Sequence, residues 1–244
     1  MRVLRREVLL VLGVSLGASA AYSVVSLLAK LTANRPLAQQ TATLNPSQAP
    51  GRPWLDLTYQ LMGIFFALVP ALLALHLLGR PAAELLGLDR RRPAFDVLAG
   101  VVLAAAIGIP GLGLYFLAHA LGVNATVVPA ALPHVWWAVP VLVLSAAQNA
   151  LLEEIVVVGY LLTRLRELGW RTWTAVAASA TLRGSYHLYQ GFGAFVGNAV
   201  MGVVFGLFFL RTRRILPLVV AHTLLDVVSF VGYALLRDRL PFLR

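Results

Sequence analysis

The sequence LLEEIVVVGY, residues 151–160, places two adjacent carboxylates inside an apolar segment. An ionised side chain at the centre of a bilayer costs about 2.5–3.5 kcal/mol on insertion scales, so a pair of them needs partners or a function. Two later apolar segments carry ionisable residues four positions apart, which lie on one face of a helix. We therefore predict that three helices point six groups at one place. These groups are Glu153, Glu154, Arg183, His187, His222 and Asp226.

Composition indicates a membrane protein. The 244 residues are 59% hydrophobic and only 12% charged, whereas soluble domains contain about 25% charged residues. A net charge of +10 would favour nucleic acid binding in a soluble protein. Here the basic residues lie between apolar runs, where they orient membrane helices, so we expect a lipid bilayer and no nucleic acid as partner. The absence of cysteine excludes disulfides, thiolate nucleophiles and cysteine-bound metals.

Seven apolar runs have about the length needed to cross a bilayer at a rise of about 1.5 Å per residue. They cover residues 8–29, 57–78, 95–121, 137–162, 173–189, 194–210 and 215–236. We expect an all-α, polytopic transmembrane helical bundle of about seven to eight spans. The first run also resembles a cleavable signal peptide with a site at Ala18-Ser19-Ala20, but it continues past that site. Pro110 should kink the third run, and the polar residues 30–56 predict an exposed loop.

The basic residues alternate along the chain. Arginines are frequent at the amino terminus and in residues 79–94, 163–172 and 211–214, and they are absent from residues 122–134 and 190–193. The positive-inside rule then predicts a cytoplasmic amino terminus. We expect an integral protein of a bacterial plasma membrane. Seven spans would leave the basic tail, residues 237–244, outside and against the rule. The last run is therefore either re-entrant or one of eight.

The six clustered groups are suited to hydrolysis. Counted from the arginine-rich ends, they lie within roughly 10 Å of one another in depth around the middle of the membrane. A carboxylate there can act as a base, and a histidine can share the proton or stabilise an oxyanion. Together they could activate a water molecule.

The order of these motifs resembles the CPBP family, also called the Abi family, of intramembrane CAAX prenyl endopeptidases and bacteriocin-processing proteins. Its signatures EExxxR, FxxxH and HxxxN/D correspond here to Glu153-Glu154, to His187, and to His222 with Asp226, within about residues 140–236. The resemblance implies that Glu153 activates the water, Glu154 supports it, and His187 shares it. His222 and Asp226 would form the oxyanion side or complete a ligand set. It divides the chain into amino-terminal transmembrane helices (1–134), catalytic helices (135–236) and a basic tail (237–244).

The resemblance leaves the cofactor open, because the family is described both as metal-dependent and as using a glutamate-activated water without metal. Glu153, His187 and His222 could hold a divalent metal such as zinc with an open position. A soluble-type HExxH motif is absent.

Two positions depart from the family signatures. Val158 stands where the family has arginine, four residues after Glu154, and Arg183 stands where it has phenylalanine, four residues before His187. Because a buried carboxylate needs a partner, we hypothesise that Arg183 supplies from another helix the counter-charge that Val158 cannot.

Three functions are compatible with these residues. The first is an intramembrane endopeptidase acting on a membrane-anchored protein or peptide. The second is a catalytically silent relative that serves as a membrane scaffold. The third, a proton-coupled transporter, is disfavoured because the charges cluster in the carboxyl-terminal half and no matching pair of broken segments is evident. The oligomeric state is left open.

Other polar residues in the apolar runs are expected to make structural hydrogen bonds between helices. Asn198 is the one that could face the cluster from the sixth run. The set comprises Gln148, Asn149, Tyr160, Tyr186, Tyr189 and Asn198, with His76 and His119 as structural histidines near span ends.

Overall fold

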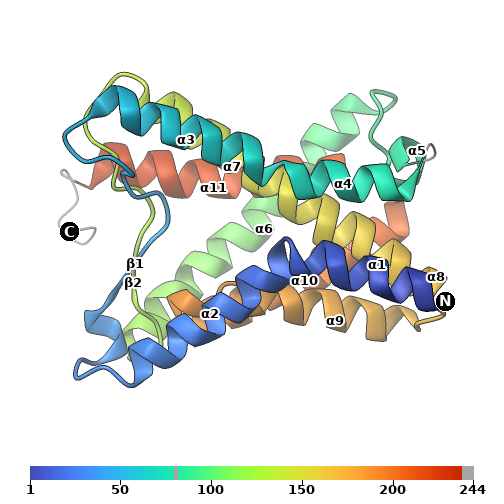
Figure 1. Cartoon of the computed structure of the whole chain (residues 1–244), viewed down its shortest axis with the longest axis horizontal. Helices are drawn as coiled ribbons and strands as arrows, with labels where there is room; N and C mark the ends of the chain where they lie inside the picture. The colour runs from blue at the N-terminus through green and yellow to red at the C-terminus, as the bar shows by residue number, and fades with distance from the viewer. Residues whose placement is uncertain (80–81, 238–244) are drawn as a thin grey trace.

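The computed structural model describes residues 1–79 and 82–237. Apolar runs of the expected lengths fold as helices, which pack side by side (Figure 1). Their bounds are α1 (Arg2–Gly13), α2 (Leu16–Leu31), α3 (Pro53–Ala67), α4 (Val69–Leu78), α5 (Ala82–Leu86), α6 (Pro93–Ala120), α7 (Ala138–Glu153), α8 (Leu161–Glu167), α9 (Thr172–Ser185), α10 (Phe192–Thr212) and α11 (Leu216–Leu236). The short elements are the 3₁₀ turns η1 (Leu37–Gln39) and η3 (Leu188–Gln190), the π-helix η2 (Glu154–Tyr160), and the strands β1 (Thr41–Thr43) and β2 (Thr126–Val128).

The expected number of seven to eight spans is not confirmed. Among the described residues, five helices are long and apolar enough to cross a membrane, and the pair α1 and α2, bent by 52°, would make a sixth if it counts as one span. The five cover Pro53–Leu78, Pro93–Ala120, Ala138–Glu167, Phe192–Thr212 and Leu216–Leu236. The chain is thus an integral membrane protein by the length and composition of its helices.

The predicted fifth span is a shorter helix. Residues 173–189 were expected to cross the bilayer, but α9 has 14 residues and ends at Ser185. A 14-residue helix is about 21 Å long, less than the hydrocarbon thickness of about 30 Å. The backbone turns at Tyr186 and His187 and continues as η3. This early end places His187 inside the bundle.

The loop expected over residues 30–56 is partly buried and ordered. Its strand β1 pairs in parallel with β2, with Ala42 opposite Val127, and the side chain of Ala42 is buried. Lys30 donates from Nζ to the carbonyl of Tyr189 at 2.7 Å, which ties the end of α2 to η3. The all-α expectation therefore omitted one pair of three-residue strands, which are too short to show an alternating pattern.

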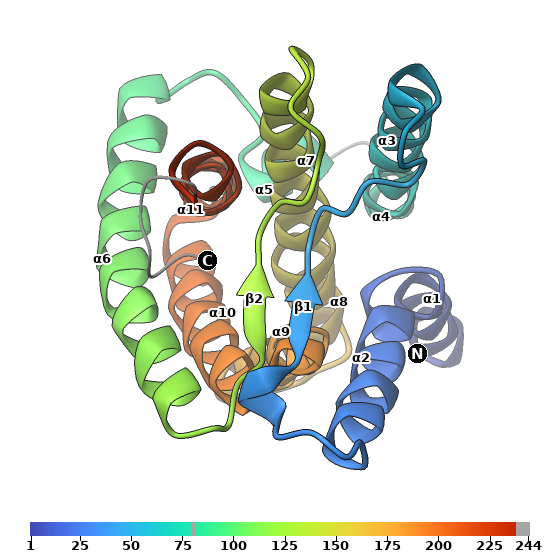
Figure 2. The ribbon, with the colours of Figure 1, turned by 90° about the vertical axis from the view of Figure 1, so that its left-hand side faces the viewer.

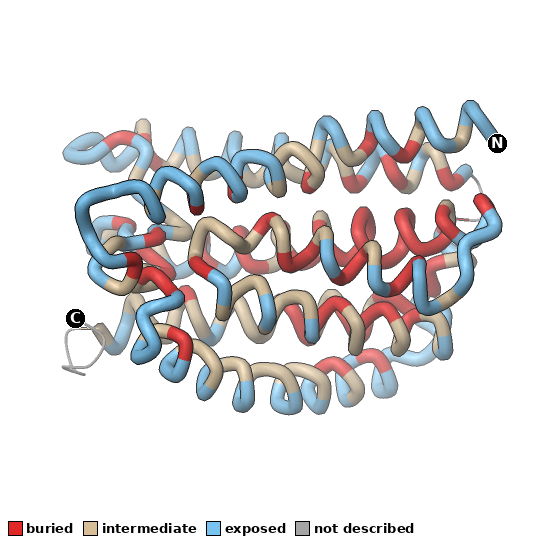
Figure 3. The backbone as a smooth tube through the Cα atoms, turned by 90° about the horizontal axis from the view of Figure 1, so that it is seen from below, coloured by how far each residue is buried: buried red, intermediate tan, exposed pale blue. Residues whose placement is uncertain are grey.

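The helices lie side by side in a bundle, with α6 at one edge and α2 and α3 at the opposite edge (Figure 2). Helix α11 packs against α6 and α7, while α10 packs against α9 and α6, and α3 and α2 lie on the outer side of this group. Helix α6 continues unbroken through Pro110 and curves along one side of the bundle. Figure 3 shows that buried residues concentrate in the inner helices. Every residue of η2 is buried.

The arginine-rich segments were predicted to lie on one side of the membrane. The start of α1 lies at the same end of the bundle as α5 and α8, and the strands lie toward the other end (Figure 1). The arginine-rich segments near α1, α5 and α8 thus share one end, as the alternation requires. Of the predicted basic tail, residues 238–244 lie outside the described residues.

Candidate active site

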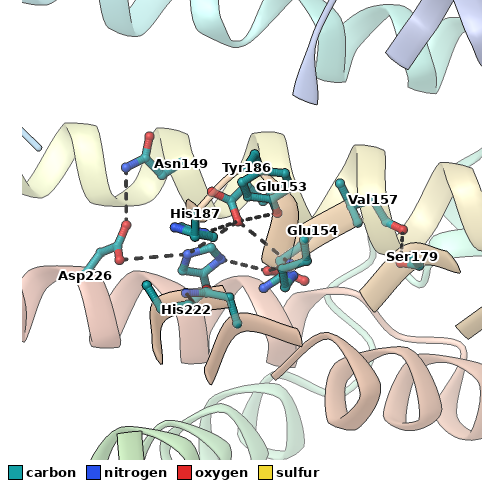
Figure 4. A network of polar contacts seen from close by, with 12 residues as sticks. Asn149, Glu153, Glu154, Val157, Ser179, Tyr186, His187, His222 and Asp226 are labelled. Atoms are coloured by element: carbon teal, nitrogen blue, oxygen red, sulfur yellow. Dashed lines mark hydrogen bonds and ion pairs between the residues drawn. The ribbon is translucent and has the colours of Figure 1, made fainter. Parts of the chain in front are cut away.

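Three parts of the chain bring the site together (Figure 4). The end of α7 and the start of η2 supply two glutamates, α9 and the turn after it supply an arginine, a tyrosine and a histidine, and α11 supplies a histidine and an aspartate. The contacts below link the six residues that the sequence placed at one point. These six are Glu153, Glu154, Arg183, His187, His222 and Asp226. Tyr186 joins them, although the sequence did not assign it to the site.

Glu154 is held by two cationic or imidazole groups. Its Oε1 accepts a hydrogen bond from Arg183 Nη2 at 2.5 Å and lies 2.7 Å from His222 Nδ1. Both Glu154 and Arg183 are fully buried. The ion pair hypothesised from the exchanged arginine is therefore present. Because a buried carboxylate is stabilised by direct pairing, this contact explains how the bundle accommodates Glu154.

Glu153 lies in a looser environment. Its Oε2 accepts a hydrogen bond from the Tyr186 hydroxyl at 2.8 Å. The same oxygen lies 3.9 Å from His187 Nε2 and 4.0 Å from His222 Nε2. His187 Nε2 is buried without a hydrogen-bond partner among the described residues. One carboxylate oxygen thus faces two imidazole nitrogens, and one of these nitrogens has unused hydrogen-bonding capacity.

The spacing of these atoms bears on water and metal binding. Two ligands on tetrahedral zinc, at about 2.0–2.1 Å from the ion, lie about 3.4 Å apart. Two groups that hydrogen-bond one water at about 2.8 Å lie about 4–4.5 Å apart. The observed 3.9 and 4.0 Å are close to the spacing for a shared water. The oxygen and nitrogen donors are of the kind that zinc accepts, but they would need to approach one another by about 0.5 Å to bind it.

A second set of possible metal ligands overlaps the first. Glu153, Glu154 and His222 each offer one atom, and these atoms lie within 4.8 Å of one another. The set predicted from the sequence contained His187 in place of Glu154. Glu154 Oε1 is already bonded to Arg183 and His222, so Oε2, which has no hydrogen-bond partner among the described residues, is the oxygen that Glu154 could offer to a metal.

Asp226 lies at the edge of the cluster. Its Oδ1 is 3.8 Å from His222 Nε2, and its Oδ2 accepts from Asn149 Nδ2 at 3.3 Å. Its side chain is 21% exposed, whereas the Glu153 side chain is 11% exposed and the Glu154 side chain is fully buried. The cluster is therefore more open on the side of Asp226. Asn149, which was expected to make an interhelical bond, does so at the site.

A π-helical turn shapes the glutamate pair. The chain passes from α7 into η2 between Glu153 and Glu154, and such turns occur frequently at functional sites. The carbonyl of Val157 within η2 accepts a hydrogen bond from the buried Ser179 hydroxyl at 2.7 Å. Ser179 lies one helical turn before Arg183 in α9, so one face of α9 contacts both η2 and Glu154. Sequence reasoning found neither this turn nor Ser179, since no residue pattern distinguished the π-helix from an α-helix.

Close packing of α10 makes room for Arg183. A Cβ atom at Gly202 would lie 2.8 Å from the Cα of Ala180 and 3.3 Å from the Cδ of Arg183. The first of these contacts is shorter than real Cβ atoms show. Small residues let helices approach closely, and at Gly202 this close packing reaches the side chain that pairs with Glu154.

The other polar residues have mostly structural contacts. Asn198, which could have faced the cluster, donates from Nδ2 to the carbonyl of Ala194 in its own helix at 3.0 Å. Tyr160 donates to Glu7 of α1 at 3.0 Å, and His119 lies 3.0 Å from the Thr126 hydroxyl of β2. These bonds link helices or loops, as expected for Tyr160 and His119.

Part of the chain matches a known protein family. Residues 135–228 match the family model described as Type II CAAX prenyl endopeptidase Rce1-like. Every residue of the cluster lies within the matched segment. No curated protein and no solved structure matches the chain. The resemblance read from the motifs is thus confirmed for this segment, and the family is one of proteases.

Proposed function

We propose that the chain is an intramembrane endopeptidase that hydrolyses a peptide bond of a membrane-associated protein or peptide. The observation that supports this most strongly is that Glu153 Oε2 faces two imidazole nitrogens at 3.9 and 4.0 Å within the bundle. A carboxylate and imidazoles around one point are the groups that general-base activation of water requires.

In the proposed reaction, Glu153 Oε2 and His187 Nε2 hold a water molecule. Glu153 takes a proton from the water as its oxygen attacks the carbonyl carbon of the scissile peptide bond. The carbonyl oxygen becomes an oxyanion, which an N–H of His222 stabilises. Glu153 then gives the proton to the leaving amine nitrogen as the C–N bond breaks. The products are a new carboxylate and a new amine.

Glu154 is assigned a positioning role in this reaction. Its Oε1 is bonded to both Arg183 and His222, so this oxygen is not available to a water, and Glu154 is assigned the role of holding these two side chains in place. It fixes the His222 ring through Nδ1, which leaves Nε2 directed toward Glu153 and Asp226. This is the arrangement in which a buried partner sets the orientation of a catalytic histidine.

A metal ion is compatible with the same residues. Glu153, His187 and His222 would hold it, and it would supply Lewis-acid polarisation of the peptide carbonyl and of bound water.

The proposed substrate is a membrane-anchored protein or peptide. The site lies within helices that have the length and composition of membrane spans, so a peptide bond must enter the bilayer to reach it. The wider exposure of Asp226 suggests the side of entry. A catalytically silent scaffold is the alternative, which the following experiment distinguishes.

The test is cleavage of membrane-anchored reporter peptides by the purified full chain in lipid vesicles, followed by mass spectrometry. We expect cleavage by the unaltered chain and loss of it in Glu153→Ala and His187→Ala. Glu84→Ala, which removes an exposed carboxylate of α5, is the matched control and should retain activity. Absence of cleavage across a broad set of anchored peptides, with the chain folded, would favour the silent scaffold.

A further inference from the structure

The two adjacent glutamates differ in how their carboxylates are held. Glu154 has two close partners at 2.5 and 2.7 Å. Within the described part of the chain, the Glu153 carboxylate has one hydrogen-bond partner, the hydroxyl of Tyr186 at 2.8 Å. The charged groups near Glu153, including Arg183 Nη2 at 4.0 Å, are too distant for direct hydrogen bonds.

Tyr186 is well fixed to act as such a partner. It follows the last residue of α9, and its backbone N–H donates to the carbonyl of Leu182 at 3.2 Å. The residue is 5% exposed, and its ring lies 4.9 Å, centroid to centroid, from the ring of His187. Tyr186 and His187 therefore form one packed unit at the end of α9, and both face Glu153.

A single hydrogen bond has a large influence on a carboxylate in this position. The terminal torsion of a glutamate side chain is broad, so rotation about it is weakly restricted by the side chain itself. A donor fixed to one oxygen restricts that rotation. Here the bonded oxygen, Oε2, is the same atom that faces His187 Nε2 and His222 Nε2.

We propose that Tyr186 is a positioning residue whose hydroxyl donates to Glu153 Oε2 and holds that oxygen toward His187 and His222. This inference rests on the proposed function for its effect on the rate. The geometric part, that the hydroxyl sets the environment of the Glu153 carboxylate, is independent of any activity.

The first experiment compares two tyrosine variants in the full chain. Tyr186→Phe retains the ring and removes the hydroxyl, and we expect kcat to fall about 10–100-fold, as misplacement of a catalytic group does, with KM changed less than about twofold. Tyr160→Phe is the matched control, because it removes a tyrosine hydroxyl that donates to a glutamate outside the site, Glu7 of α1, at 3.0 Å. Replacement of Tyr186 by 4-aminophenylalanine retains a donor and should recover activity. An unchanged kcat in Tyr186→Phe, or equal losses in both variants, would overturn the proposal.

The second experiment is infrared spectroscopy, which needs no substrate. The difference between the unaltered chain and Glu153→Gln isolates the carboxylate stretching bands of Glu153. We expect these bands to shift in Tyr186→Phe, to remain unchanged in Tyr160→Phe, and to return with 4-aminophenylalanine at position 186. If the chain cleaves no peptide but the bands shift, the proposed function fails and the contact stands. If the bands are the same in Tyr186→Phe, the positioning role is wrong. If Tyr186→Phe does not fold, the 4-aminophenylalanine protein is compared with Tyr186→Met by the same two measurements.

Discussion

Two buried arginines differ in how completely their hydrogen bonds are used. Arg214, between α10 and α11, donates from Nε and Nη2 to both oxygens of Asp96 at 2.6 and 2.7 Å, and from Nη2 to Asp89 at 3.1 Å. Arg183 donates from Nη2 to Glu154, while its Nε and Nη1 are buried without a hydrogen-bond partner among the described residues.

This difference distinguishes the hydrogen bonds of Arg214 with Asp96 and Asp89, which we call the Arg214 network, from those of Arg183 at the candidate active site. A bidentate arginine–carboxylate pair has its bonding satisfied and fixes the positions of the elements it joins, here α6 and the segment before α11. Unsatisfied polar atoms are rare in buried sites and need an explanation. In the cluster around Arg183 the unpartnered atoms also include Glu154 Oε2 and His187 Nε2. We infer that the Arg214 network stabilises the fold. The polar atoms around Arg183 that have no hydrogen-bond partner remain available to bind a water or a substrate.

The largest expected effect comes from replacing one carboxylate by an amide in each network. Glu153→Gln should lower activity by about 10²–10⁴-fold, because it removes the base, and should leave thermal stability nearly unchanged. Asp96→Asn should lower the free energy of unfolding by about 1–3 kcal/mol, because Arg214 loses part of its pairing, while the folded fraction stays active. Peptide cleavage and thermal unfolding in detergent measure both variants. The opposite assignment of effects would contradict the comparison.

The next effect concerns the exchanged arginine. Arg183→Phe leaves Glu154 buried without its cation, which should destabilise the protein by about 3–5 kcal/mol and remove activity. Adding Val158→Arg returns a cation to η2, four residues after Glu154, and should recover part of the stability and the activity. The measurement is thermal unfolding and cleavage by the single and double variants. An active Arg183→Phe beside an inactive double variant would refute the exchange.

A smaller effect is expected at the π-helical turn. Ser179→Ala removes the hydrogen bond to the Val157 carbonyl and should lower the free energy of unfolding by about 0.5–1.5 kcal/mol. Ser185→Ala is the control, since the Ser185 hydroxyl bonds the Thr181 carbonyl of its own helix. Thermal unfolding of the two variants gives the comparison. Equal stability of both variants would show that the tie between α9 and η2 is dispensable.

The smallest effect is a dependence of stability on acid. The backbone N–H of Arg91 and the side chain of Arg214 hold the pKa of Asp89 below its usual value. A carboxyl with a depressed pKa in the folded state stabilises the protein above its unfolded pKa of about 3.9, and the contribution is lost as the pH falls through the folded value. Asp89→Asn should therefore reduce the loss of thermal stability between about pH 5 and pH 2. An identical pH profile for this variant would exclude the contribution.

Several features of the site followed from the sequence. Helical periodicity related His222 to Asp226, which both lie in α11, because residues four apart share a face of a helix. The same premise was wrong for Arg183 and His187, since α9 ends at Ser185, although both side chains lie near Glu153. The cost of burying a charge indicated that Glu154 needed a partner and that Arg183 was available. These inferences depended on local geometry and on energies large enough to exclude alternatives.

Other features could not be derived in this way. The early end of α9 depends on how the segment from Tyr186 to Gln190 packs against α2, which hydropathy does not report. The strands β1 and β2 are far apart in the sequence, and each contributes only three residues to the pairing, so no local pattern predicts it. Tyr186 was interpreted as an ordinary interhelical donor. The sequence could not place its hydroxyl beside Glu153, because that contact depends on the π-helical turn and on the packing of α9.

The most direct test of the central claim is cleavage of an anchored peptide in vesicles prepared in H₂¹⁸O. We expect the unaltered chain to produce a fragment whose new carboxyl group contains one ¹⁸O atom, and Glu153→Gln to produce none above background, with mass spectrometry as the readout. Equal product from the unaltered chain and from folded Glu153→Gln would contradict the assignment of Glu153 as the base that activates water.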